Sequence, residues 1–170
     1  MNLLMTATPL AMDATQHPFS DAAFVIQWHM VGMFAPAFLT GHLIQRLGLL
    51  PVMLIGVALN IACVAIALAG VGVPHFWLAL VLLGIGWNFM FVGATTLLTE
   101  SHGPVERAKV QGVNDVAIFV TMIITSLASG ALFTLQGWHA MNRWAVPVMA
   151  LAGAAVLWLM WLRRNPARSG

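Results

Sequence analysis

The sequence predicts an all-α transmembrane fold, a bundle of five full spans preceded by a short amino-terminal helix segment. Only 7% of the 170 residues are charged and 61% are hydrophobic, whereas about a quarter of the residues in a soluble domain are charged. Five apolar stretches reach the ~20 residues that a helix needs to cross a bilayer. A soluble chain of this length could not cover its surface with so few charges, so lipid is the expected surroundings.

The amino-terminal segment, residues 1–12, is apolar but does not resemble a signal peptide. It lacks a basic n-region and a cleavage site. It is also too short to cross a bilayer, which takes about 20 residues. We expect it to be the end of a longer helix whose beginning is missing.

The five predicted spans follow in order, with short connections that make consecutive helices antiparallel neighbours. They cover residues 22–43, 50–69, 76–98, 113–135 and 144–162. In hydrocarbon every backbone N–H and C=O needs an internal partner, so apolar runs of this length must be helices. Residues 1–162 are therefore expected to form one transmembrane bundle, and residues 163–170 a tail outside the membrane.

Polar residues are shared unevenly among the spans. The first span contains Gln27 and His29, the third contains Asn88, and the fourth contains Asp115 and several threonines and serines. The second and fifth spans contain very few polar groups. A helix with a polar stripe needs a partner or a wet cavity. We expect the first, third and fourth spans to line a cavity, and the second and fifth to act as scaffold.

Basic residues predict the orientation of the bundle. Alternating the spans across the membrane puts six basic residues on one side and only Arg143 on the other. The six are Arg46, Arg107, Lys109, Arg163, Arg164 and Arg168. Because basic loops stay in the cytoplasm, the carboxyl terminus is expected to be cytoplasmic, in a multi-pass protein of a bacterial inner membrane.

Two loops on the predicted cytoplasmic side contain motifs. Between the first two spans, Gly41 and Gly48 allow close approach and a tight turn, and Arg46 supplies a cation. Between the third and fourth spans, Glu100 and Arg107 are spaced so that an ion pair joins two helix ends. We expect Arg46, Glu100 and Arg107 to lie together, with Glu100 as the shared acceptor.

These loops resemble the cytoplasmic loop signatures of the major facilitator superfamily. The first signature, Gly-x-Leu-x-Asp-Arg-x-Gly, is matched except that Gln45 replaces the acidic residue. The second pattern is matched by Glu100, Pro104, Arg107 and Gly112. The resemblance implies the carboxy-terminal six-helix half of a transporter, in which residues 1–12 end the seventh helix and the spans are helices eight to twelve. It also implies transport of a small solute by alternating access, which the family often couples to protons.

Four residues are candidates for the wall of a substrate cavity: Gln27, His29, Trp87 and Asn88. Asn88 lies near mid-bilayer, where transporter sites lie, although an interhelical hydrogen bond would explain it equally well. His29 could bind a proton or the solute, and a structural histidine is an open alternative. Asp115 is a candidate for the cytoplasmic gate, or simply a carboxylate favoured near a helix amino terminus.

Other function classes fit poorly. A bis-histidine haem needs two facing histidines at one depth, and only His29 is embedded. The single Cys63 lies in an apolar run without metal-ligand spacing, so we expect no metal and no cofactor. No catalytic arrangement is visible, and an enzyme is not expected.

The expected partners are the lipid bilayer, a small-molecule substrate, and a missing amino-terminal half or a second copy of the chain; no nucleic acid is expected. The alternative is a truncated, non-transporting protein that needs a partner half.

Overall fold

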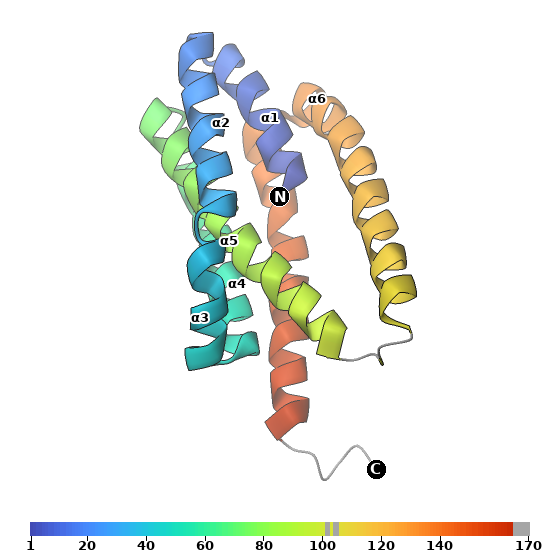
Figure 1. Cartoon of the computed structure of the whole chain (residues 1–170). Coiled ribbons are helices and arrows are strands. Elements are labelled where there is room, and N and C mark those ends of the chain that lie inside the picture. Colours follow the sequence, from blue (N-terminus) through green and yellow to red (C-terminus); the bar gives the residue numbers. More distant parts are fainter. Residues whose placement is uncertain (101–102, 104–105, 165–170) are drawn as a thin grey trace.

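The computed structural model of the chain describes residues 1–100, 103 and 106–164, and within these residues it is helical without strands (Figure 1). The all-α fold class is thus confirmed. The helices are α1 (Asn2–Ala14), α2 (Phe19–Phe34), α3 (Ala37–Leu47), α4 (Leu49–Ala69), α5 (Val73–Glu100) and α6 (Arg107–Arg164). By length and composition, α4, α5 and α6 are each able to cross a membrane, and α2 with α3 makes a fourth candidate.

The first predicted span is broken in the structure. α2 and α3 meet at an angle of 42°, and Pro36 stands between them as the N-cap of α3. Proline has no N–H to continue a helix, and its ring clashes with the preceding turn. α3 ends at Leu47, and the next residue, Gly48, has a φ of 90° that suits glycine and turns the chain directly into α4.

The last two predicted spans are joined more tightly than the sequence indicated. α6 consists of two helices that meet at Gly137, which has φ 74° and ψ 176°. The chain reverses there, and the two halves of α6 run in opposite directions (Figure 1). Each half exceeds the ~20 residues of a span. The expected loop at 136–143 is therefore one glycine followed by further helix.

α5 is the central helix, packed against α2 on one side and α4 on the other. At both contacts glycines bring the backbones together. A Cβ built on Gly84 would lie 2.6 Å from the carbonyl oxygen of His29 in α2, and one on Gly86 would lie 2.8 Å from that of Gly56 in α4. Small residues are what allow helices to approach this closely in a membrane.

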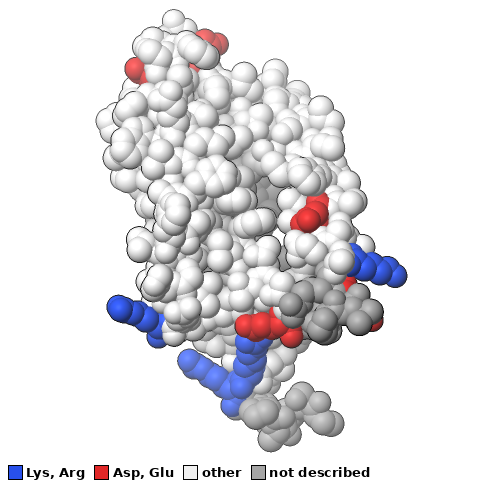
Figure 2. Space-filling model, viewed as in Figure 1, with Lys and Arg blue, Asp and Glu red and all other residues white. Residues whose placement is uncertain are grey.

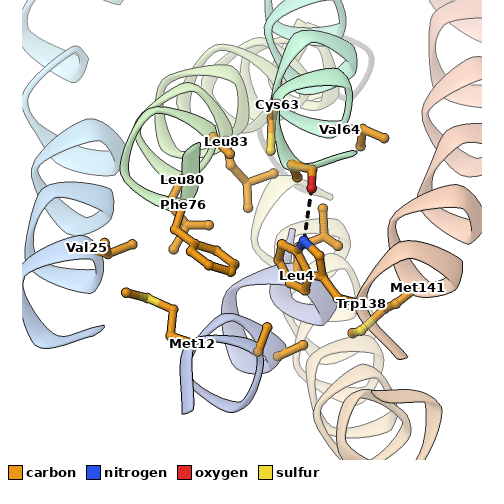
Figure 3. Packing of buried hydrophobic residues seen from close by; sticks show 14 of the residues in the cluster. Leu4, Met12, Val25, Cys63, Val64, Phe76, Leu80, Leu83, Trp138 and Met141 are labelled. Carbon is orange, nitrogen blue, oxygen red and sulfur yellow. Dashed lines mark hydrogen bonds between the residues drawn. The ribbon is translucent and has the colours of Figure 1, made fainter. Parts of the chain in front are cut away.

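The main buried cluster lies in the half of the bundle that holds α1 (Figure 3). There Leu4 and Met12 of α1 pack against Phe76 and Leu80 of α5. The indole of Trp138, just after the Gly137 turn, joins this cluster and donates to the carbonyl oxygen of Ala67 at 3.0 Å. α1 therefore packs only against the first half of α5.

Candidate functional site

One side of α5 is covered by α1 over its first half and is open over its second half. Leu80 and Leu83 belong to the cluster under α1. Trp87 and Phe91 continue the same stripe at helical spacing of four residues, but they lie beyond the end of α1. Trp87 is half-buried and Phe91 is 37% exposed. In Figure 1 this part of α5 crosses the front of the bundle with no helix over it.

The first half of α6 continues this surface on the other side of a gap. Its upper part is tied to α1, because the Asn2 amide donates to the Met122 carbonyl oxygen at 2.9 Å and to the Ser126 hydroxyl at 2.7 Å. Asp115 lies seven residues before Met122 and therefore on the same side of the helix, below α1. It accepts a hydrogen bond from Gln111 Nε2 at 2.9 Å and is exposed.

We call this surface the open face: Trp87 and Phe91 on α5, with Gln111 and Asp115 on α6. The space-filling view is hollowed on this side of the molecule, between the second half of α5 and the first half of α6 (Figure 2). One wall is aromatic and the other is polar. Such a surface can bind a solute that has a flat apolar part and hydrogen-bonding groups.

Asn88 does not lie on the open face, and the prediction that it faces a cavity is wrong. Its side chain is 3% exposed. Its Nδ2 donates to the carbonyl oxygen of Met33 at 2.7 Å, and its Oδ1 accepts from the Thr40 hydroxyl at 2.7 Å. In an unbroken helix the N–H of Ala37 would bond the Met33 oxygen. At the α2–α3 break, Asn88 of α5 supplies that donor instead.

His29 is also turned inward, toward α5. It is fully buried, and its Nδ1 lies 2.8 Å from the carbonyl oxygen of Leu80. A carbonyl only accepts, so Nδ1 carries a proton. Nε2 has no hydrogen-bond partner among the described residues. The predicted cavity position is therefore wrong for His29 too, and its bond to Leu80 reinforces the close α2–α5 contact.

Gln27 lies on the exposed side of α2, opposite the buried stripe that includes Val25 and His29. Its contact with a solute stays a prediction. Of the four cavity candidates, Trp87 is the one on the open face. Sequence reasoning missed Phe91, although an aromatic residue four positions after Trp87 is visible in the sequence as a helical neighbour.

The family comparison agrees with this architecture. The model of the Major Facilitator Superfamily matches residues 1–170, the whole chain. The chain belongs to the major facilitator superfamily.

Relatives within the superfamily are transporters of greater length. The chain is 46% identical over 151 residues to the riboflavin transporter RfnT of Brucella anthropi, covering 89% of this chain and 38% of the relative. It is 33% identical over 162 residues to the uncharacterised transporter YddS of Bacillus subtilis, covering 94% of this chain and 35% of the relative. The chain thus spans well under half the length of these relatives. No solved structure matches it.

The superfamily loop motifs are only partly accounted for by the structure. Gly48 makes the sharp turn before α4, as expected. Gly41 and Gly112 lie inside helices, and a Cβ on either would meet nothing within 4 Å, so close approach does not explain them. Pro104 lies outside the described residues.

The charge pairing at this end of the bundle differs from the expectation. Glu100 pairs with Arg163, at the end of α6, across 3.5 Å. Arg46 makes no ion pair with any residue that the structure describes, and the side chain of Arg107 lies outside the described part. The expected Glu100–Arg46 pair is therefore replaced, because the last turn of α6 ends beside the end of α5. Lys and Arg side chains nevertheless gather at this end of the molecule (Figure 2).

Proposed function

We propose that the chain forms the carboxy-terminal half of a transporter that moves riboflavin, or a closely related flavin, by alternating access. The similarity to the Brucella anthropi riboflavin transporter over 89% of the chain carries this proposal. Secondary transporters of this superfamily consist of two halves, with the solute site near the bilayer midplane between them.

The open face supports a flavin-like solute. Riboflavin combines a flat conjugated ring system with a polyhydroxylated chain. Trp87 and Phe91 offer aromatic surface for the ring, because aromatic groups attract one another in offset-stacked or edge-to-face contacts. Gln111 and Asp115 offer amide and carboxylate groups for hydroxyls. The open face would then be part of the site, and the part of the transporter that precedes this chain would supply the rest.

The packing supports movement of the half as one rigid unit. Glycine contacts join α5 to α2 and to α4, and hydrogen bonds from His29, Thr40 and Asn88 hold the same seam. Alternating access in such folds is largely rigid-body rocking of one half against the other. We propose the orientation that the basic residues favour, with the carboxyl terminus in the cytoplasm.

Uptake of labelled riboflavin tests the proposal directly. The host is a bacterium that neither makes nor imports riboflavin. It should express the chain alone, the chain fused behind the preceding part of the Brucella anthropi transporter, or that preceding part alone as the control. We expect uptake from the fusion well above that of the control. Fusion protein that reaches the membrane but imports no riboflavin would contradict the flavin proposal, and the alternative of a non-transporting half would then gain support.

A further inference from the structure

The short helix α3 is held between two breaks in the chain. At its start, Pro36 lacks the N–H that would bond the Gly32 carbonyl oxygen in a continuous helix, and α2 and α3 meet at 42°. At its end, Gly48 with its φ of 90° separates α3 from α4. Hinges are a few residues at element ends that absorb changes of φ and ψ. α3 can therefore change direction at either end without unwinding.

α2 and α3 differ in how firmly they pack against α5. α2 is interlocked with α5, because a Cβ on Gly32 would lie 2.9 Å from the Val81 carbonyl oxygen. α3 has no such contact, because a Cβ on Gly41 would meet nothing within 4 Å. Of the 11 residues of α3, all of which the structure describes, Thr40 alone is buried. Close backbone contact therefore fixes α2 on α5 but does not fix α3.

A single side chain of α3, Thr40, makes a buried hydrogen bond to α5. Its hydroxyl donates to Asn88 Oδ1 at 2.7 Å, and we call this bond the latch. The same hydroxyl lies 2.8 Å from the Pro36 carbonyl oxygen, a second acceptor for its one proton. The Asn88 amide group donates separately to Met33 of α2 at 2.7 Å. Breaking the latch therefore leaves the Thr40 hydroxyl and the Asn88 amide each with an acceptor.

We propose that α3 is a movable arm, held in its observed position by the latch and free to turn between Pro36 and Gly48 when the latch opens. The rest of this seam, α2, α4 and α5, keeps its glycine contacts and stays rigid. α3 lies at the end of the bundle where Lys and Arg gather (Figures 1 and 2), and it carries His42 and Arg46. Movement of the arm therefore displaces a cation at this end. The arm goes beyond the proposed function, since it depends on no particular solute.

Pulsed electron paramagnetic resonance on the purified chain in detergent measures the position of the arm. Spin labels at Gln27 on α2 and Gln45 on α3, in a Cys63→Ala background, are separated by about 27 Å along the two helices at about 1.5 Å per residue. Both positions are exposed. A second pair, Gln27 with the exposed Ala94 of α5, reports whether α2 and α5 stay together. We expect one dominant Gln27–Gln45 distance in the unaltered chain.

Thr40→Val removes the proton of the latch and keeps the shape of the side chain. We expect a second Gln27–Gln45 distance, with the ratio of released to latched protein raised roughly 3- to 20-fold, the range for loss of one hydrogen bond in a membrane bundle. Thr40→Ser keeps the hydroxyl and should behave as the unaltered chain. Thr96→Val is the matched control, because the Thr96 hydroxyl bonds within its own helix, to Val92 at 2.8 Å. The Gln27–Ala94 distance should be the same in every variant.

Pro36→Ala tests the hinge independently, because alanine supplies an N–H that can bond the Gly32 carbonyl oxygen. Added to Thr40→Val, it should restore a single Gln27–Gln45 distance. If Thr40→Val does not fold, warming the unaltered chain should populate the second distance, and Pro36→Ala alone should suppress it.

Three results would overturn the proposal. A Gln27–Gln45 distance that Thr40→Val leaves unchanged would show that the latch does not hold α3. Equal broadening of the Gln27–Gln45 and Gln27–Ala94 distances would show that Thr40 stabilises the whole seam and that no separate arm exists. A second distance that persists when Pro36→Ala is present would place the movement elsewhere than at this break.

Discussion

Replacing Asn88 with leucine tests how the broken α2–α3 segment is stabilised. Leucine has a similar shape but can neither donate to the Met33 carbonyl oxygen nor accept from the Thr40 hydroxyl, bonds that both measure 2.7 Å. The Thr40 hydroxyl keeps its second acceptor, the carbonyl oxygen of Pro36 at 2.8 Å. The Met33 oxygen keeps no donor among the described residues. The main loss is therefore one buried, unsatisfied carbonyl.

The expected size of the effect follows from that loss. Leaving a buried acceptor unsatisfied costs about 1–3 kcal/mol, and side-chain hydrogen bonds within membrane bundles contribute at most about 1.7 kcal/mol. We therefore expect Asn88→Leu to lower the free energy of unfolding by about 1–2 kcal/mol. For a chain of this length that corresponds to a fall in Tm of roughly 2–8 °C. Asn88→Asp should cost more, because it would also bury a carboxylate without a paired charge beside the Met33 oxygen.

The assay is the Tm of the purified protein in detergent, followed by loss of the monodisperse species on heating. Thr121→Val is the control, because Thr121 is exposed and its hydroxyl bonds only within its own helix, to Ala117 at 2.7 Å. Its Tm should stay within about 1 °C, as expected of a surface change. An unchanged Tm for Asn88→Leu, together with impaired uptake, would refute this reasoning and return Asn88 to the cavity wall.

Two further predictions concern packing and orientation. Gly84→Ala should sharply reduce the amount of folded protein, because the added Cβ would lie 2.6 Å from a backbone oxygen of α2. Gly130→Ala is the control and should be tolerated, because its Cβ would meet nothing within 4 Å. Equal membrane levels of the two variants would disprove the close contact. Tags at Gly103 and at the carboxyl terminus should report the cytoplasm, and a tag at Gly72 the opposite side; labelling of Gly103 from outside the cell would reverse the orientation.

The helices and their contacts were largely predictable from the sequence, and the inward direction of single polar groups was not. Apolar length fixes the spans because backbone groups must be bonded within each helix. Gly84 and Gly86 lie within one apolar span of the sequence, and small residues of this kind are typical of close helix contacts, which the structure shows with α2 and α4. The Asn88 amide avoids an unsatisfied polar group equally well by facing a wet cavity or by bonding to a neighbouring helix. The cost of burying an unpaired amide therefore could not decide between the two positions.

Other differences have local causes that the sequence pattern hides. The loop expected at 136–143 contains four polar or basic residues, yet Gly137 alone makes the turn and helix resumes at once. Asn142, one of these four residues, is buried and donates to the Trp138 carbonyl oxygen of its own helix at 2.9 Å. The partner of Glu100 depends on where the distant end of α6 lies, which spacing along the chain does not encode.

The most direct test of the account is whether the open face is wet and occupied by the solute. In a Cys63→Ala background, which removes a cysteine only 1% exposed, Ala94→Cys in the fusion protein should react with a small water-soluble thiol reagent, because the reactive thiolate forms in water. Ala94 is exposed and lies seven residues after Trp87, on the same side of α5. Trp158→Cys, at a side chain that is 65% exposed on the second half of α6 and that we expect to face lipid, should react far more slowly. Added riboflavin should slow labelling at Ala94→Cys and leave Trp158→Cys unaffected. An unreactive Ala94→Cys, or one that reacts equally with and without riboflavin while uptake is intact, would contradict the account.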